Sequence, residues 1–456
     1  MNSTVAGLCR LSIRAPGKSF DLAVPADVPL ADLLPTIVGY AGDDLDEAGL
    51  DHGGWVLQDL GDAPLDEEAT PEVLGLRDGQ VLYLRSRQDS LPAVHFDDIV
   101  DGIGTGLRDR PGAWHPAATK WLLHGMALVA AAFAWAGILL SGPTLPRTAA
   151  AIVVALLLLA AAGSASRAVG DAVAGTLYGV AAVPLFALAG LLVPGPSATP
   201  AALLLASATA AAGGVVLALV ASGTHPQVHL GVLVVCVFGV LTAGIMLAAG
   251  ELASAFAVTA VLAVIFGAFV PGLAFRLAGL KMPPLPTNAD QLQEGIDPLP
   301  SKTVLDRGAV ADQYLVALFL ATGAVCAAAI TGLLTAPGWA PVVTAGVLSV
   351  LLLLHGREVG GIRTRLAVVL PGAYGLAALA ITQAVHLALP GRLLLVVGVL
   401  LAGAALMVAG WTVPGRRMVP YWGRIADVVH VLFAVALLPL TLLVLGVFGF
   451  LRAING

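Results

Sequence analysis

Residues 147–165 read RTAAAIVVALLLLAAAGSA, a run of apolar and small side chains behind one arginine and one threonine. A helix that spans the hydrocarbon core of a bilayer needs about 20 such residues. Runs of this kind recur from residue 121 onward, separated by short breaks rich in Gly, Pro and charge. The pattern predicts eleven transmembrane helices, at 121–141, 147–165, 172–193, 200–221, 228–249, 252–276, 312–334, 339–356, 364–389, 392–411 and 424–451.

The composition of the whole chain agrees with a membrane protein. Of its 456 residues, 58% are hydrophobic and 11% are charged, whereas soluble domains carry about 25% charged residues. Residues 1–90 hold 16 acidic and 6 basic side chains, and the rest holds 13 and 17. The chain therefore combines a small acidic domain with a large apolar body, and an ordinary soluble enzyme is excluded.

Other site classes have no support in the sequence. The cysteines Cys9, Cys236 and Cys326 form no CxxC pair, so neither a disulfide framework nor a zinc site is indicated. With a sequence pI of about 5.8 and no basic run, nucleic-acid binding is not expected. No nucleotide loop, metal-ligand cluster or protease motif is recognised, and no cofactor is predicted.

The N-terminal segment, residues 1–88, has the pattern of a small α+β domain. Apolar and polar residues alternate over 8–14 and 20–24, which predicts a β-hairpin. Apolar residues at helical spacing follow over 30–38, and two further strands are predicted at 55–58 and 80–85. The order β-β-α-β-β resembles the ubiquitin-like (β-grasp) fold, which by analogy of fold is a binding module.

An acidic cluster stands out in this domain: Asp43, Asp44, Asp46, Glu47 and Asp51. One interpretation is a solvated loop. The other is a docking face for a basic partner domain.

The connector, residues 89–120, also has two interpretations. Phe96, Ile99, Val100, Ile103 and Leu107 have helical spacing, but the segment contains several glycines and a proline that weaken a helix. It is either a short helix on the membrane surface or a flexible linker.

The basic residues between the predicted spans indicate their orientation. With the N-terminus in the cytoplasm, the inner segments hold 14 Lys and Arg, and the outer segments hold only Arg147, Arg392 and Arg452. This is the bias of the positive-inside rule. It predicts a multi-pass protein with a cytoplasmic N-terminus and an extracytoplasmic C-terminus.

One predicted cytoplasmic loop, residues 277–311, is far longer than the others. Loops of this length are usually functional or disordered, so it is either a partner contact or a plain linker. Its candidate contact residues are a Pro-rich start and two acidic side chains: Met282, Pro283, Pro284, Leu285, Pro286, Asp290 and Glu294.

Ionisable residues inside the spans are few and lie near predicted span ends. His355, Arg357 and Glu358 stand at one inner end, and Asp427 and His430 stand near another. Arg424 precedes Asp427 by three residues, which predicts a local ion pair. A proton- or ion-coupled carrier usually places such groups at mid-membrane.

The architecture resembles the EccD family, the polytopic membrane component of the type VII (ESX) secretion system. The resemblance covers the whole chain and is carried by the opening strand at 9–13, the turn Leu76-Arg77-Asp78-Gly79 and the Pro-rich loop at 282–286. It implies a non-enzymatic scaffold that forms a homodimer in a lipid membrane. The implied partners are EccB, the ATPase EccC and EccE, with the ATPase supplying the energy for protein export. The alternatives are a secondary transporter with an accessory domain and a membrane receptor or regulator.

Overall fold

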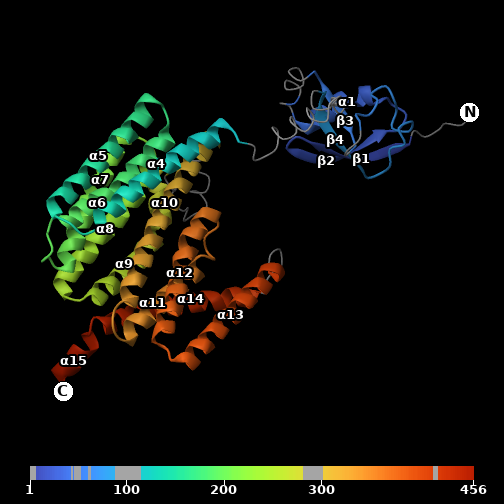
Figure 1. Ribbon diagram of the computed structural model, residues 1–456. Helices are drawn as coiled ribbons and strands as arrows, with labels where there is room; N and C mark the ends of the chain where they lie inside the picture. The colour runs from blue at the N-terminus through green and yellow to red at the C-terminus, as the bar shows by residue number, and fades with distance from the viewer. Residues whose placement is uncertain are drawn as a thin grey trace, which may run out of the picture. The chain divides into compact units, whose positions relative to one another are not determined.

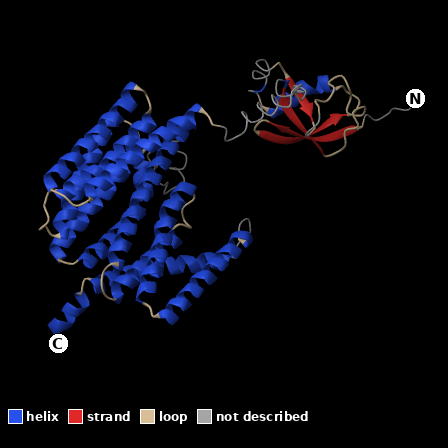
Figure 2. Cartoon of the chain, in the orientation of Figure 1, coloured by secondary structure: helices blue, strands red, loops and turns tan. Residues whose placement is uncertain are grey.

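The computed structural model describes residues 7–42, 45, 53–59, 63–87, 114–280, 301–413 and 420–455. The chain divides into two compact units, Met1–His115 and Pro116–Gly456. The described strands belong to the first unit, and the second is built of helices (Figure 2).

The N-terminal unit is a four-stranded mixed sheet with one described helix (Figure 1). Strands β1 (Leu8–Ala15) and β2 (Lys18–Pro25) form an antiparallel hairpin, closed at Gly17, whose φ of 85° favours glycine. Helix α1 (Leu30–Ala41) follows, and then β3 (Trp55–Gln58) and β4 (Gln80–Ser86). The sheet order is β2-β1-β4-β3, with β1 parallel to β4. The predicted ubiquitin-like fold is confirmed.

Alternation along β1 builds the core of this unit. Leu11 and Ile13 are fully buried between more exposed neighbours, and Leu82 of β4 and Ile37 of α1 pack into the same cluster. Burying each such side chain stabilises the fold by about 1.5–3 kcal/mol. Cys9 belongs to this core, where it packs as a small apolar side chain, and burial raises the pKa of its thiol.

The second unit consists of consecutive helices, and most of the connections that the structure describes are short turns (Figure 1). Their bounds are α4 (Pro116–Leu139), α5 (Thr144–Gly163) with a π-helical extension η2 (Ser164–Ala168), α6 (Ala172–Leu192), α7 (Pro200–Ser222), α8 (Pro226–Ala249), α9 (Leu252–Leu277), α10 (Ser301–Leu334), α11 (Trp339–His355), α12 (Ile362–His386), α13 (Leu389–Thr412), α14 (Pro420–Val444) and α15 (Val447–Asn455).

Helices α4 to α14 lie at the eleven predicted positions. Within the described residues, ten of them are long and apolar enough to cross a membrane, and α11, with 17 residues, is shorter. Seventeen helical residues rise about 26 Å, which is near the lower limit for a span. The helical membrane body is confirmed.

The structure corrects the predicted bounds at three places. The last span was expected over 424–451, but α14 ends at Val444 and α15 begins at Val447, because Gly446 adopts a left-handed conformation with φ of 73°. Helix α10 begins at Ser301, so residues 301–311 are helical rather than part of the loop expected at 277–311. Their charges, including Lys302, Asp306 and Arg307, hide this extension from a hydropathy pattern. Similarly, α4 begins at Pro116, inside the expected connector.

Glycines allow the central helices to approach closely. A Cβ atom added to Gly231 of α8 would lie 2.8 Å from the carbonyl oxygen of Ala317 in α10. A Cβ on Gly372 of α12 would lie 2.7 Å from the carbonyl oxygen of Ser349 in α11. In a bilayer, the hydrophobic effect does not drive helices together, because lipid tails are as apolar as the side chains. Close van der Waals packing of this kind therefore stabilises the association of the helices.

Helix α4 is attached differently, because none of its residues is buried. Lys120 Nζ lies 2.5 Å from Asp171 Oδ2, in the turn before α6, and His124 Nδ1 lies 2.6 Å from Tyr178 Oη. Trp135 also donates to the carbonyl oxygen of Pro184 at 3.2 Å. Polar contacts to α6 therefore hold this helix on the body.

We expect Gly231→Leu to lower the thermal stability of the purified chain, because the new side chain meets the backbone of α10. Overpacking of this kind costs about 1–3 kcal/mol. Thermal unfolding followed by fluorescence-detected size exclusion measures the effect. The control is Gly244→Leu on the same helix, where a Cβ meets nothing within 4 Å. Equal melting temperatures for the two variants would contradict the packing argument.

We also expect the attachment of α4 to depend on pH. The hydrogen bond from Lys120, followed by that from the Ala174 amide, holds the pKa of Asp171 below its ordinary value of 3.8. The stabilisation is therefore present at neutral pH and is lost as the pH falls through the lowered pKa. At pH 7, Asp171→Asn should imitate this loss and increase amide hydrogen exchange over residues 116–124. Asp306→Asn, which removes an equal charge from an exposed position of α10, is the control and should leave that exchange unchanged.

Candidate functional site

The residues predicted from the sequence as partner contacts lie outside the described residues. This applies to Asp43, Asp44, Asp46 and Glu47 and, in the long loop, to Met282, Pro283, Pro284, Leu285, Pro286, Asp290 and Glu294. Their roles stay predictions. The described residues bring together a different group of chemical interest.

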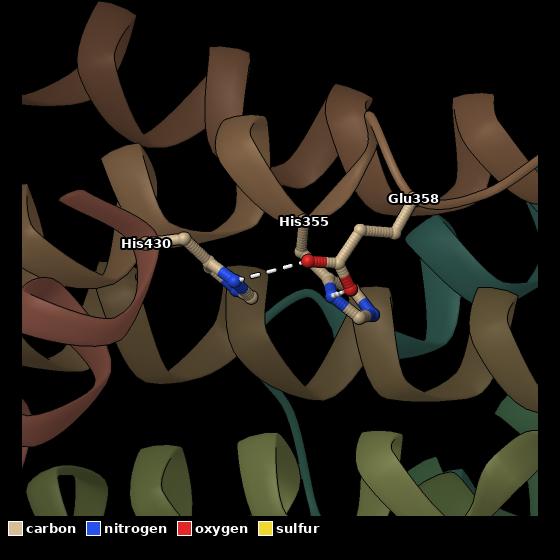
Figure 3. A group of neighbouring side chains, drawn as sticks. All are labelled: His355, Glu358 and His430. Carbon is tan, nitrogen blue, oxygen red and sulfur yellow. Dashed lines mark ion pairs between the residues drawn. The ribbon is translucent and has the colours of Figure 1, made fainter. Parts of the chain in front are cut away.

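Two histidines and a glutamate converge in the second half of the membrane body (Figure 3). His355 is the last residue of α11, Glu358 lies in the turn that leads to α12, and His430 belongs to α14. Glu358 Oε2 is 3.5 Å from His355 Nδ1, and Glu358 Oε1 is 3.2 Å from His430 Nδ1. The carboxylate therefore lies between the two imidazoles (Figure 3).

The end of α11 positions Glu358. Gly356 ends the helix, and the Glu358 amide donates to the His355 carbonyl oxygen at 3.0 Å, which forms a tight turn. Arg365 of α12 holds this turn from the other side, since it donates to the carbonyl oxygens of Val359 at 3.0 Å and Arg357 at 3.3 Å. The turn is thus fixed by bonds to both flanking helices.

An ion pair beside the group joins the same turn to α14. Arg357 Nη2 lies 3.1 Å from Asp427 Oδ1 and also donates to the Gly423 carbonyl oxygen at 3.4 Å. The prediction of a local pair between Arg424 and Asp427 was therefore wrong about the partner. The structure favours Arg357 because the turn after α11 packs against the first turns of α14.

The histidine rings pack against one another and against α10. The rings of His355 and His430 are stacked at 5.6 Å, and the ring of Phe319 is 6.1 Å from that of His355. A cavity of about 220 Å³ borders both histidines, with Thr322 and Cys326 of α10 in its wall. The cavity therefore extends from the two histidines into the space between the helices.

Such a group can share a proton or hold a cation. The sequence pattern predicts no metal-ligand cluster, because His430 is remote in sequence from the other two residues. The one local signal was the spacing of three between His355 and Glu358. The packing of α11 against α14 in the folded chain completes the group.

A second polar region lies where α6, α8 and α12 begin, beside Asp312 and Gln313 of α10. Thr176 Oγ1 is 2.8 Å from His225 Nδ1, and Gln227 donates to Gln313 at 2.6 Å. A cavity of about 470 Å³ in this region is lined by Asp312 and Arg363, among others. These contacts tie α6 to the start of α8, and α8 to α10.

Comparisons with known proteins identify both units. The family model described as EccD-like transmembrane domain matches residues 119–454. The one described as WXG100 protein secretion system (Wss), protein YukD, matches residues 8–84. The ESX-4 secretion system proteins eccD4 of two Mycobacterium tuberculosis strains, CDC 1551/Oshkosh and H37Rv, are each 29% identical to this chain over 483 residues. Each alignment covers 100% of this chain and 99% of the relative.

Two solved structures share the fold at 19% identity and a TM-score of 0.58. One is described as protomer 1 of the ESX-3 core complex, with 97% of this chain and 100% of that chain covered. The other is described as the MycP5-free ESX-5 inner membrane complex, State II, with 90% and 100% covered. The family expected from the sequence is confirmed. Because the matched transmembrane domain spans most of its length, the chain belongs to the EccD family, the multi-pass structural membrane subunits of type VII secretion systems.

Proposed function

We propose that this chain scaffolds an inner-membrane export complex as a homodimer, with a partner ATPase supplying the energy and no enzymatic activity of its own. The observation that carries the proposal is the union, in one chain, of a YukD-like domain at 8–84 and an EccD-like membrane domain at 119–454. Full-length coverage of an ESX-4 relative supports it. By this analogy the other subunits are EccB, the ATPase EccC and EccE.

The exposed faces of the membrane body support a scaffolding role. Like α4, helix α13 has no buried residue, and it packs beside α12 at the edge of the body (Figure 1). Leu394, Leu400 and Leu406 are 66–74% exposed along α13. Apolar helices with this much free surface suit contact with lipid tails or with other membrane subunits.

The position of the charges weighs against the alternative of a secondary transporter. In the described part of the body, the ion pairs Lys120–Asp171 and Arg357–Asp427 lie at helix ends. A carrier coupled to protons or ions usually binds them near mid-membrane, between broken helices. For the alternative of a membrane receptor or regulator, no feature in the described part of the membrane body offers support.

We propose a cytoplasmic N-terminus and an extracytoplasmic C-terminus, on the strength of 14 basic residues in inner segments against 3 in outer ones. Residues 1–88 then form a cytoplasmic docking module. The connector expected at 89–120 leads from it to the membrane domain, which was expected at 121–456 and begins with α4 at Pro116. The acidic residues of the module and the loop between α9 and α10 lie on the same side and serve as partner contacts.

The first experiment is affinity purification of the chain from native membranes in mild detergent. We expect a large complex that contains an ATPase and other membrane subunits, together with at least two copies of this chain. Recovery of a monomer alone would refute the scaffold. Solute transport by the purified chain alone, once reconstituted, would instead favour the transporter.

The docking role of the N-terminal domain gives a second prediction. Reversing Asp43 and Asp44 to lysine should weaken recovery of the ATPase at least tenfold, because the acidic face would then repel a basic partner. The control reverses Glu68 and Glu72, two exposed acidic residues on the described part of the same domain. Equal recovery with both double variants would exclude the acidic cluster as the contact.

A further inference from the structure

The group of His355, Glu358 and His430 has no part in the proposed scaffold function. Its ligand atoms come from three parts of the chain, α11, the following turn and α14, and all lie within 4.8 Å of one another. We propose that these three side chains form a binding site for a divalent transition-metal ion of the zinc class.

The donor set fits such an ion. Imidazole nitrogens and carboxylate oxygens are zinc ligands, and three protein ligands leave a fourth tetrahedral position for water. Bonds of about 2.0–2.2 Å place tetrahedral ligand atoms about 3.3–3.5 Å apart. Glu358 contacts each imidazole through a different oxygen, Oε2 at 3.5 Å from His355 Nδ1 and Oε1 at 3.2 Å from His430 Nδ1. Both contacts are close to that separation, so the carboxylate faces both nitrogens at a distance suited to an ion.

The local charge favours a cation. The neighbouring guanidinium of Arg357 is paired with Asp427, so it does not neutralise Glu358. The guanidinium of Arg365 is directed at the carbonyl oxygens of Val359 and Arg357. With both imidazoles neutral, the three ligands carry one negative charge, as in zinc sites built from two histidines and a carboxylate.

The surroundings hold the ligands in place and leave an entry path. The hydrogen bonds of Arg365 fix the turn that carries Glu358, and the His355 ring packs near Phe319. Such outer contacts orient ligands and raise metal affinity. The Glu358 side chain is 53% exposed, whereas those of His355 and His430 are 29% and 21% exposed. An ion therefore enters from the side of Glu358 and is held by the more buried imidazoles.

A bound ion would connect the end of α11, the turn that follows it and α14. It would reinforce the link already made by Arg357 and Asp427. Because α14 follows the exposed helix α13, the ion would fasten the last helices of the body to its core.

The test is titration of the purified, tag-free full chain with Co²⁺ and then Zn²⁺. We expect uptake of one equivalent of Co²⁺ with the visible bands of a tetrahedral ion and displacement by Zn²⁺. No thiolate charge-transfer band should appear, because Cys326 lines the same cavity but is not a ligand. The melting temperature should rise with Zn²⁺ concentration, since the ion binds the folded state.

Matched variants assign the ligands. Each ligand is replaced in turn, in the variants His355→Gln, Glu358→Gln and His430→Gln. Each variant should lower the affinity for Co²⁺ by at least about tenfold, because losing a ligand lowers metal affinity at least as much as losing an outer hydrogen bond to a ligand. His386→Gln, at the end of α12 and outside the group, should change nothing. The proposal would be overturned if the wild-type chain took up no stoichiometric Co²⁺, a result that does not depend on whether the variants fold. It would also be overturned if all three ligand variants bound Co²⁺ as tightly as the wild-type chain. Both measurements use the isolated chain, so they are independent of complex assembly.

Discussion

The membrane body depends on one constraint, which is that backbone amides and carbonyls find no water in the hydrocarbon core. Each unsatisfied group there costs several kcal/mol, so the chain must pair them within each segment as a helix. The breaks between helices accordingly coincide with Gly, Pro and polar residues, as at Gly250 between α8 and α9. Everything else in this unit is an arrangement of helices that already satisfy their own backbones.

What holds those helices together is shape and a few polar contacts. Where glycines face a neighbour, as at Gly231 and Gly372, backbones meet almost directly and the core becomes dense. Helix α4 has no buried residue, and an ion pair and hydrogen bonds attach it to the neighbouring helix instead. The body therefore has a tightly packed centre around α9 to α12 and apolar helices at its margin that remain open to lipid or to other subunits.

Much of this fold could be predicted because two periodicities are strong. The alternation through Cys9, Leu11 and Ile13 requires a half-buried strand, and the apolar runs after residue 121 require spanning helices. The errors fall where hydropathy carries no information. The break at Gly446 interrupts an apolar run without any charge, and the first turns of α10 are polar yet helical.

The candidate site could be predicted even less well, because sequence periodicity does not reveal which helices are in contact. His355, Glu358 and His430 were each visible near predicted span ends, but periodicity does not state that α11 and α14 are neighbours. The partner of Asp427 was misassigned for this reason. Contacts between helices remote in sequence are decided by packing, and they create the chemistry of the group.

The length of α10 has a structural consequence. Its 34 residues rise about 51 Å, well beyond a hydrocarbon core of about 30 Å. The far half of the helix carries Leu318, Ile330 and Leu333 in the densest part of the body, while its first turns carry exposed charges. A continuous helix of this length therefore joins a charged, exposed segment directly to the densest packing of the bundle, with no break between them.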